Sequence, residues 1–280
     1  MHIVNVKVEM RNSHGLWNAL SLLELASSPK IAEMLKPFVR PITDCYECGV
    51  EVPTLPCKHE TTKDIGVAAL FLKRSLNDLR ATWNLLLLGY TSQAGSVAAA
   101  AFENALAISC IAGSINIAEQ FLKSESGLPW SVADLCRMQA SQTKEDENYW
   151  EVSYSQYKWL CKVKHPTIPS ALHDAFSVSL TGSEYIVMGA PDTRTEDLPS
   201  KAFILSVTIL RVTEAIRSFA LARRLDFEKP NVVSWQNRLD SIATNLDAAV
   251  DPLMKMPLPF TYDGRIFQKD SERAEQKNEY

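Results

Sequence analysis

The clearest pattern of apolar positions lies between Asp64 and Gly113, and it predicts two long helices joined by a turn at Gly89-Tyr90-Thr91-Ser92. In the first helix, two sets of apolar residues each repeat every seven positions: Ile65, Leu72, Leu79 and Leu86, and then Ala69, Leu76, Trp83 and Tyr90. Two interleaved heptads form a continuous apolar seam, which is typical of a helix that packs along a partner. The second helix, Ser96–Ala112, is apolar on nearly every side except at Glu103-Asn104.

Weaker patterns predict the rest of the chain. Shorter apolar periodicities favour helices at Leu16–Ala26, Lys30–Lys36, Asn116–Lys123, Trp130–Met138, Asp146–Lys164, Ser200–Leu225 and Val233–Val250. Alternation of apolar and polar residues predicts a short strand at Ile3–Val8 and a β-hairpin within Phe176–Met188. Three prolines and a glycine between Val39 and Glu60 predict a loop or small knuckle.

These elements define a mainly α fold: a helical bundle with a small β-hairpin and an N-terminal zinc-knuckle-like loop. The predicted division is an N-terminal segment with a Cys/His loop at 1–60, a helical bundle domain at 61–252 and a tail at 253–280. The charged segment that follows Gln268 is expected to be disordered.

Composition narrows the functional classes. The 280 residues carry a formal net charge of -4, which predicts no strong non-specific grip on nucleic acid or on an anionic membrane. The most apolar stretch, Val97–Ala112, is short and contains Glu103, so we expect a buried helix and no membrane span. The N-terminus shows no signal-peptide pattern, and the six cysteines then favour a reducing, cytoplasmic location in which clustered thiols bind metal more often than they form disulfides.

One cysteine cluster has the spacing of a metal site. Cys45 and Cys48 are separated by two residues and followed by Gly49, as in the turn of a zinc knuckle, and Cys57 and His59 follow closely enough to complete a tetrahedral site. Such a zinc ion would be structural, because four protein ligands leave no open position. The alternative is three loop thiols and a solvated histidine.

The dipeptide Glu103-Asn104 breaks the apolar pattern of its helix. A carboxylate among alanines and leucines is either buried with a partner or faces a cavity. The structural interpretation is an ion pair with an arginine such as Arg74 or Arg80, and the functional one is a site carboxylate inside the bundle.

A basic cluster stands at the end of the helix predicted at Asp146–Lys164. It contains Lys158, Lys162, Lys164 and the following His165. A histidine at a helix C-terminus is biased towards its protonated form, so it can contact phosphate or act as a general acid. The alternative is a solvated face, which is the commoner role of a run of surface charges.

The order of these motifs resembles uncharacterised prokaryotic helical proteins related to the HEPN superfamily. The resemblance covers roughly Asp64 to Pro166 and rests on Leu88-Gly89-Tyr90, on Phe102-Glu103-Asn104, and on an aromatic helix that ends Tyr157-Lys158-Trp159-Leu160-Cys161 before His165-Pro166. It implies a helical bundle, often dimeric, and in many members a metal-independent ribonuclease of a defence or toxin system.

The HEPN active motif is an arginine followed, after four to six residues, by a histidine. No arginine lies between Arg137 and Arg194, so the resemblance assigns His165 the histidine role with Lys158 or Lys162 as the cation. Lysine lacks the planar fork with which arginine grips phosphate. We therefore expect a non-catalytic binding or regulatory module of a prokaryotic defence or toxin-type system, with a protein or RNA partner, and keep a HEPN-like ribonuclease with His165, Glu103 and Lys162 as the alternative.

Overall fold

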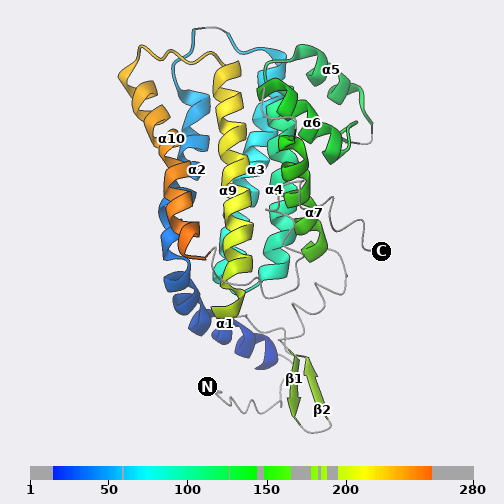
Figure 1. Cartoon of the computed structure of the whole chain (residues 1–280), viewed down its shortest axis with the longest axis vertical. Coiled ribbons are helices and arrows are strands. Elements are labelled where there is room, and N and C mark those ends of the chain that lie inside the picture. Colours follow the sequence, from blue (N-terminus) through cyan, green and yellow to red (C-terminus); the bar gives the residue numbers. More distant parts are fainter. Residues whose placement is uncertain are drawn as a thin grey trace.

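The computed structural model is mainly helical, with its long helices packed side by side (Figure 1). It describes residues 15–58, 60–125, 127–143, 148–164, 178–181, 184–187 and 195–253. The predicted strand Ile3–Val8 and the charged segment after Gln268 lie outside these residues. The α-helices are α1 (Gly15–Met34), α2 (Val39–Glu51), α3 (Lys63–Leu87), α4 (Thr91–Ile111), α5 (Ile115–Lys123), α6 (Val132–Thr143), α7 (Tyr149–Lys164), α9 (Leu198–Ala222) and α10 (Pro230–Val250).

The antiparallel pair α3–α4 is the centre of the bundle, as the heptads predict. The turn between the two helices is made at Gly89, whose φ of 84° is favourable only for glycine. At the other end of the pair, the Asp64 carboxylate at the start of α3 accepts a hydrogen bond from the Gly113 N–H just after α4, at 2.8 Å. The first heptad set is fully buried, since Ile65, Leu72, Leu79 and Leu86 all belong to the core.

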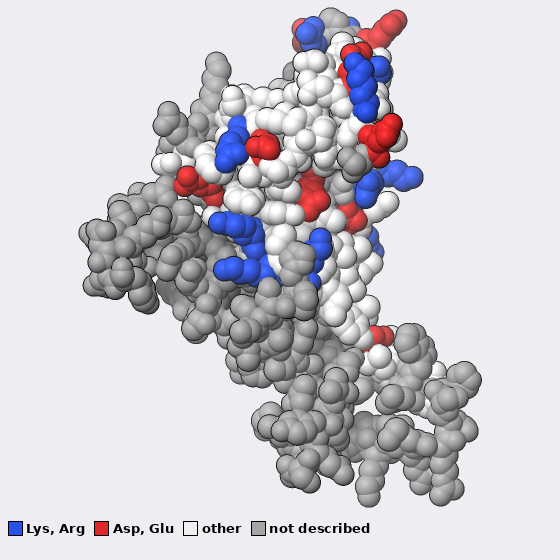
Figure 2. Space-filling view, turned by 90° about the vertical axis from the view of Figure 1, so that its right-hand side faces the viewer, with Lys and Arg blue, Asp and Glu red and all other residues white. Residues whose placement is uncertain are grey.

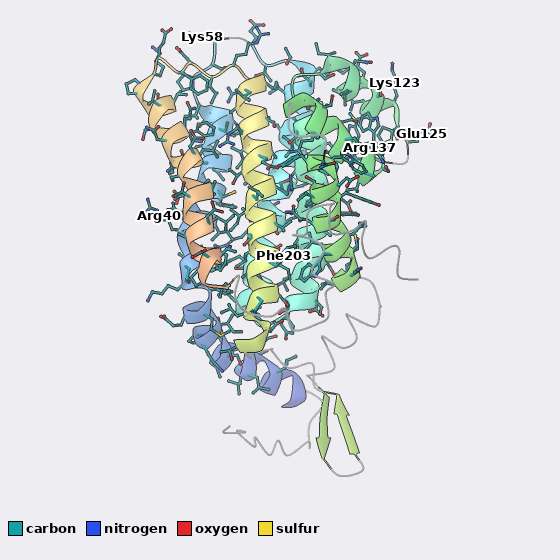
Figure 3. All side chains as sticks on the ribbon, viewed as in Figure 1. Arg40, Lys58, Lys123, Glu125, Arg137 and Phe203 are labelled. Carbon is teal, nitrogen blue, oxygen red and sulfur yellow. The ribbon has the colours of Figure 1, made fainter. Side chains whose placement is uncertain are left out.

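Other helices pack around this pair (Figure 1). Helix α9 packs on α4 and α3, α2 and α10 pack on each other and on α9, and α6 and α7 pack on α4. Trp159 of α7 meets Phe203 of α9 edge to face, with ring centroids 4.4 Å apart. Figure 3 labels Phe203 on α9. Ser114 precedes helix α5, and its Oγ accepts a hydrogen bond from the Ile117 N–H and so caps the helix.

Helix α4 is long and apolar enough to cross a membrane by length and composition. Of the most apolar 18 residues of this helix, 78% are buried inside the bundle, and a buried core helix passes the same test of length and composition. Such a helix is weak evidence for a membrane span.

The prediction of a loop at Val39–Glu60 is wrong for its first half, which forms α2. Pro41 lies in the first turn of this helix, where a backbone N–H has no intrahelical partner to lose, and Pro53 follows the helix in a 3-10 turn, Val52–Thr54. The two prolines therefore stand in the first turn of the helix and just after its end, where they do not break it. Its buried residues share one core with α3, α4 and α9.

The prediction of two helices before residue 37 is also wrong. One helix, α1, runs through the exposed Pro29 and ends at Met34, and a 3-10 turn follows at Lys36–Phe38. Helices α5, α6, α7, α9 and α10 lie where the periodicity places them, with ends shifted by a few residues. Strands β1 (Val178–Thr181) and β2 (Glu184–Val187) pair antiparallel, with Val178 opposite Val187.

Candidate functional site

The dipeptide Glu103-Asn104 on α4 connects the two helices that flank it. Asn104 is buried, and its Nδ2 donates to Asp78 Oδ2 on α3 at 2.9 Å. Glu103 is half-buried, and its Oε1 accepts a hydrogen bond from the Tyr157 hydroxyl on α7 at 2.6 Å. Glu103 thus has a tyrosine partner in place of the arginine that the sequence suggested.

Tyr157 is held as a proton donor by its surroundings. Burial raises the pKa of its phenol, and the neighbouring Glu103 and Cys161 raise it further, since a phenolate beside them would be repelled. Its ring lies against Phe102, with centroids 5.6 Å apart, and stacks on Tyr154 at 6.4 Å. The pair of Glu103 and Tyr157 therefore joins α4 to α7 by a charge-assisted hydrogen bond.

Asp78 is affected by the same partial burial. Loss of water raises the pKa of its carboxyl group, while the hydrogen bond from Asn104 and the charge of Arg74 lower it in part. Asp78, like Glu103, is therefore a partly buried carboxyl group that takes part in a polar contact between helices.

A second polar cluster, which the sequence analysis missed, surrounds Arg211 in the middle of α9. The Arg211 side chain is almost fully buried, and its Nη1 donates to Glu214 Oε2 at 2.8 Å and to the Tyr149 hydroxyl at 3.2 Å. Its Nη2 donates to Gln156 Oε1 at 2.7 Å. Glu214 also accepts from the Tyr149 hydroxyl at 2.6 Å and from Gln139 Nε2 at 3.2 Å. One ion pair thus ties α6, α7 and α9 together.

The charge of Arg211 is stabilised in place. Burial lowers the pKa of its guanidinium, but the neighbouring Glu214 and Tyr149 more than offset this, so that the pKa is raised. The guanidinium carbon lies 5.3 Å from the centre of the Phe102 ring, which connects this cluster to the pair of Glu103 and Tyr157. The sequence signal was a lone arginine in the apolar run Ile209-Leu210-Arg211-Val212.

The basic residues at the end of α7 lie on the surface. Lys158, Lys162 and Lys164 are exposed, and the Lys158 ammonium lies 5.2 Å from the centre of the Tyr154 ring. On α6, the Arg137 guanidinium lies 4.4 Å from the centre of the Trp150 ring. Viewed from the side that carries α5, α6 and α7, Lys and Arg side chains gather about halfway along the molecule (Figure 2). His165 lies outside the described residues.

The first two cysteines of the predicted zinc site lie on the buried face of α2. Cys45 Sγ donates to the Ile209 carbonyl at 3.8 Å and accepts from Thr213 Oγ1 at 3.4 Å, both on α9. Burial raises the pKa of Cys45 to about 12 and that of Cys48 to about 11. Zinc binds the thiolate, so metal binding at this position requires both thiols to lose their protons.

The third cysteine has a different environment. Cys57 is half-buried, and its Sγ accepts a hydrogen bond from Arg223 Nη2 at 3.3 Å. Its backbone pairs with Leu225 in an isolated antiparallel bridge. His59 lies outside the described residues, and within those that are described no three His, Cys, Asp or Glu side chains form a metal-binding group. The zinc site stays a prediction.

Comparison with known proteins gives the chain no relatives: no protein-family model, no curated protein and no solved structure matches it.

Proposed function

We propose that this protein is a non-catalytic binding module whose bundle presents the outer surface of α6 and α7 to RNA. The observation that carries the proposal is the pairing inside the bundle. Glu103 accepts its hydrogen bond from Tyr157, and Arg211 is buried against Glu214. Side chains engaged in this way hold helices together, so we assign contact with a partner to the outer surface, where α6 and α7 carry exposed cations and Arg137 also pairs with the exposed Asp134 at 3.0 Å.

The chemistry of that surface favours an anionic, aromatic partner. Lys158, Lys162 and Lys164 supply positive charge along the last turns of α7, and Arg137 adds a cation from α6. The rings of Trp150 and Tyr154 lie directly beside these cations. Cations that follow a phosphate backbone, together with aromatic faces on which bases stack, are how proteins bind single-stranded nucleic acid.

The binding assay compares fluorescence anisotropy of labelled single-stranded RNA with wild-type protein and with Lys158→Glu/Lys162→Glu. We expect the double variant to bind at least about tenfold more weakly, and wild-type affinity to fall as salt is raised. Lys30→Glu/Lys229→Glu reverses two exposed charges on α1 and just before α10 and is expected to bind like wild type. Equal affinities for the three proteins would contradict the proposed surface, and absence of RNA binding would direct the search to a protein partner.

The second candidate function is a HEPN-like, metal-independent ribonuclease that uses His165, with Glu103 and Lys162 in support. It is favoured by the exposed position of Lys162 at the end of α7 and by the place of Glu103 beside that helix. In this hypothesis the protein belongs to a prokaryotic defence or toxin-type system and acts as a homodimer. RNA incubated with wild type and with His165→Ala separates the two functions, because cleavage by the wild type alone supports the enzyme and no cleavage by either protein rejects it.

Zinc binding is tested separately. If Cys45, Cys48, Cys57 and His59 bind a structural zinc ion, elemental analysis of the purified protein gives about one zinc per chain. Cys57→Ala is the informative variant, because Cys57 is only half-buried and its loss disturbs the core least. Metal-free wild-type protein would reject the site.

A further inference from the structure

One carboxylate of α9 binds both helices of the proposed RNA-binding surface. Glu214 accepts a hydrogen bond from Gln139 Nε2 of α6 at 3.2 Å and from the Tyr149 hydroxyl of α7 at 2.6 Å. The buried Arg211 supplies the counter-charge at 2.8 Å and also donates to the Tyr149 hydroxyl at 3.2 Å. Charge-assisted hydrogen bonds have a narrow geometry, so this carboxylate fixes how the inner sides of α6 and α7 stand relative to each other.

The outer sides of the same two helices meet where a cation lies over an aromatic ring. The Arg137 guanidinium of α6 is 4.4 Å from the centre of the Trp150 ring of α7. Arg137 is exposed, whereas Gln139, two residues later, is buried. Trp150 directly follows Tyr149. Each member of the outer contact is therefore joined by one or two residues of helix to a side chain that Glu214 binds.

The contact between Arg137 and Trp150 depends on this support from inside the bundle. The Arg137 side chain is long, and it also pairs with Asp134 of its own helix at 3.0 Å. A cation over a ring at an exposed site is a weak interaction, and ordering an arginine side chain costs entropy. The contact is thus maintained only where the backbones of α6 and α7 are already held at the right separation.

We propose that Glu214, with Arg211 as its counter-ion, is a positioning residue of the RNA-binding surface, because it holds α6 and α7 so that Arg137 lies over Trp150. The effect on RNA affinity rests on the proposed function, whereas the effect on the contact between Arg137 and Trp150 does not. The pair then meets RNA as a preformed unit, in which the cation binds a phosphate and the ring is placed beside a base.

The first test measures the contact itself by nuclear magnetic resonance. A guanidinium over an indole has its side-chain protons shifted upfield by the ring current, so the protons of Arg137 report its position over Trp150. Tyr149→Phe removes the hydroxyl that binds Glu214 and keeps the ring, and we expect it to lose most of this shift. Gln139→Leu detaches α6 from the same carboxylate and should have the same effect.

A matched control separates positioning from a general loss of stability. Tyr157→Phe also removes an α7 hydroxyl that donates to a carboxylate at 2.6 Å, but its acceptor is Glu103 of α4. This variant should keep the ring-current shift of Arg137 at its wild-type value. A shift that is absent from the wild type, or that Tyr149→Phe and Gln139→Leu both retain, would overturn the inference.

The second test is a double-mutant cycle on RNA affinity. We expect Arg137→Ala and Tyr149→Phe each to weaken RNA binding about threefold. The double variant should bind no more weakly than Arg137→Ala alone, because Tyr149 acts on RNA through Arg137. Single effects that multiply in the double variant would reject this coupling. Wild-type protein that does not bind RNA would reject the proposed function, and the ring-current shift would then decide the positioning role alone.

Discussion

At the scale of single residues, burial decides how much each charged side chain contributes to the stability of the folded protein. Arg211 and Arg217 stand six residues apart on the same helix, and each pairs with a carboxylate at 2.8 Å. Arg211 is buried beside Glu214, whereas Arg217 and its partner Asp240 are both half exposed to solvent. Exposed ion pairs contribute little to the free energy of unfolding because water and salt screen them. Removal of one partner of a buried pair costs more, because it leaves an uncompensated charge inside the protein.

This contrast predicts different costs for two matched substitutions. We expect Arg211→Met to lower the free energy of unfolding by about 3 kcal/mol. The control, Arg217→Met, should lower it by less than about 1 kcal/mol. Urea unfolding of both variants measures the difference, and Arg211→Met/Glu214→Gln should recover part of the loss because the unpaired carboxylate is gone. Equal losses in the two single variants would contradict a special role for the buried pair.

At the scale of helices, glycines set how closely α2 and α4 approach their neighbours. A Cβ atom at Gly49 of α2 would lie 2.5 Å from a Leu76 methyl carbon and 3.1 Å from Ile216 Cδ1. A Cβ atom at Gly95 of α4 would lie 2.9 Å from Val163 Cγ1 on α7. The Cys-x2-Cys-Gly spacing predicts a zinc-knuckle turn at Gly49, but in the structure this glycine allows α2 to contact α3 and α9 closely.

Substitution by alanine tests this packing. Gly49→Ala and Gly95→Ala force neighbouring side chains to move and should each lower the free energy of unfolding by about 1–3 kcal/mol. Gly66 of α3 has no atom within 4 Å of the added Cβ, so Gly66→Ala should raise the free energy of unfolding by about 0.5–1 kcal/mol through helix propensity alone. Thermal or urea unfolding distinguishes the three, and destabilisation by Gly66→Ala of the same size as by the other two would argue against close approach as the cause.

At the scale of the whole molecule, buried thiols couple stability to alkaline pH. Burial raises the pKa of Cys45, Cys110 and Cys136 from 9.0 to about 12, and all three side chains lie in the core. Between pH 9 and 12 the unfolded chain loses these protons while the folded chain keeps them. The free energy of unfolding must then fall as pH rises through this window, because the unfolded state binds fewer protons than the folded state.

The expected loss is about 1.4 kcal/mol per thiol for each pH unit above 9. Urea unfolding under reducing conditions at pH 8 and pH 10 measures it. Cys110→Ala should reduce the pH dependence of the free energy of unfolding by the contribution of one thiol. Ser109 is a buried, non-titrating neighbour on α4, so Ser109→Ala should leave that pH dependence unchanged. Stability that is constant from pH 8 to pH 10 would show that these thiols ionise in the folded protein.

The sequence by itself determined the central pair α3–α4, the presence of the later helices and the mainly helical class. These follow from the spacing of apolar residues along one segment, as in Leu72, Leu79 and Leu86, and that spacing is a local property of the chain. The same local rules failed where proline was treated as a breaker without regard to its place, since Pro41 lies in the first turn of α2 and Pro29 lies within α1.

Only the tertiary structure decided the partners of the polar residues. The sequence identified Glu103 as exceptional, but its partner Tyr157 lies 54 residues away, and nothing in local spacing selects a tyrosine over an arginine. Cys45 and Cys48 have a metal-binding spacing, yet α2 turns both into the core, Cys45 against α9 and Cys48 beside Arg238 of α10. The Arg211 cluster draws on three helices, so it exists only once packing has brought α6, α7 and α9 together.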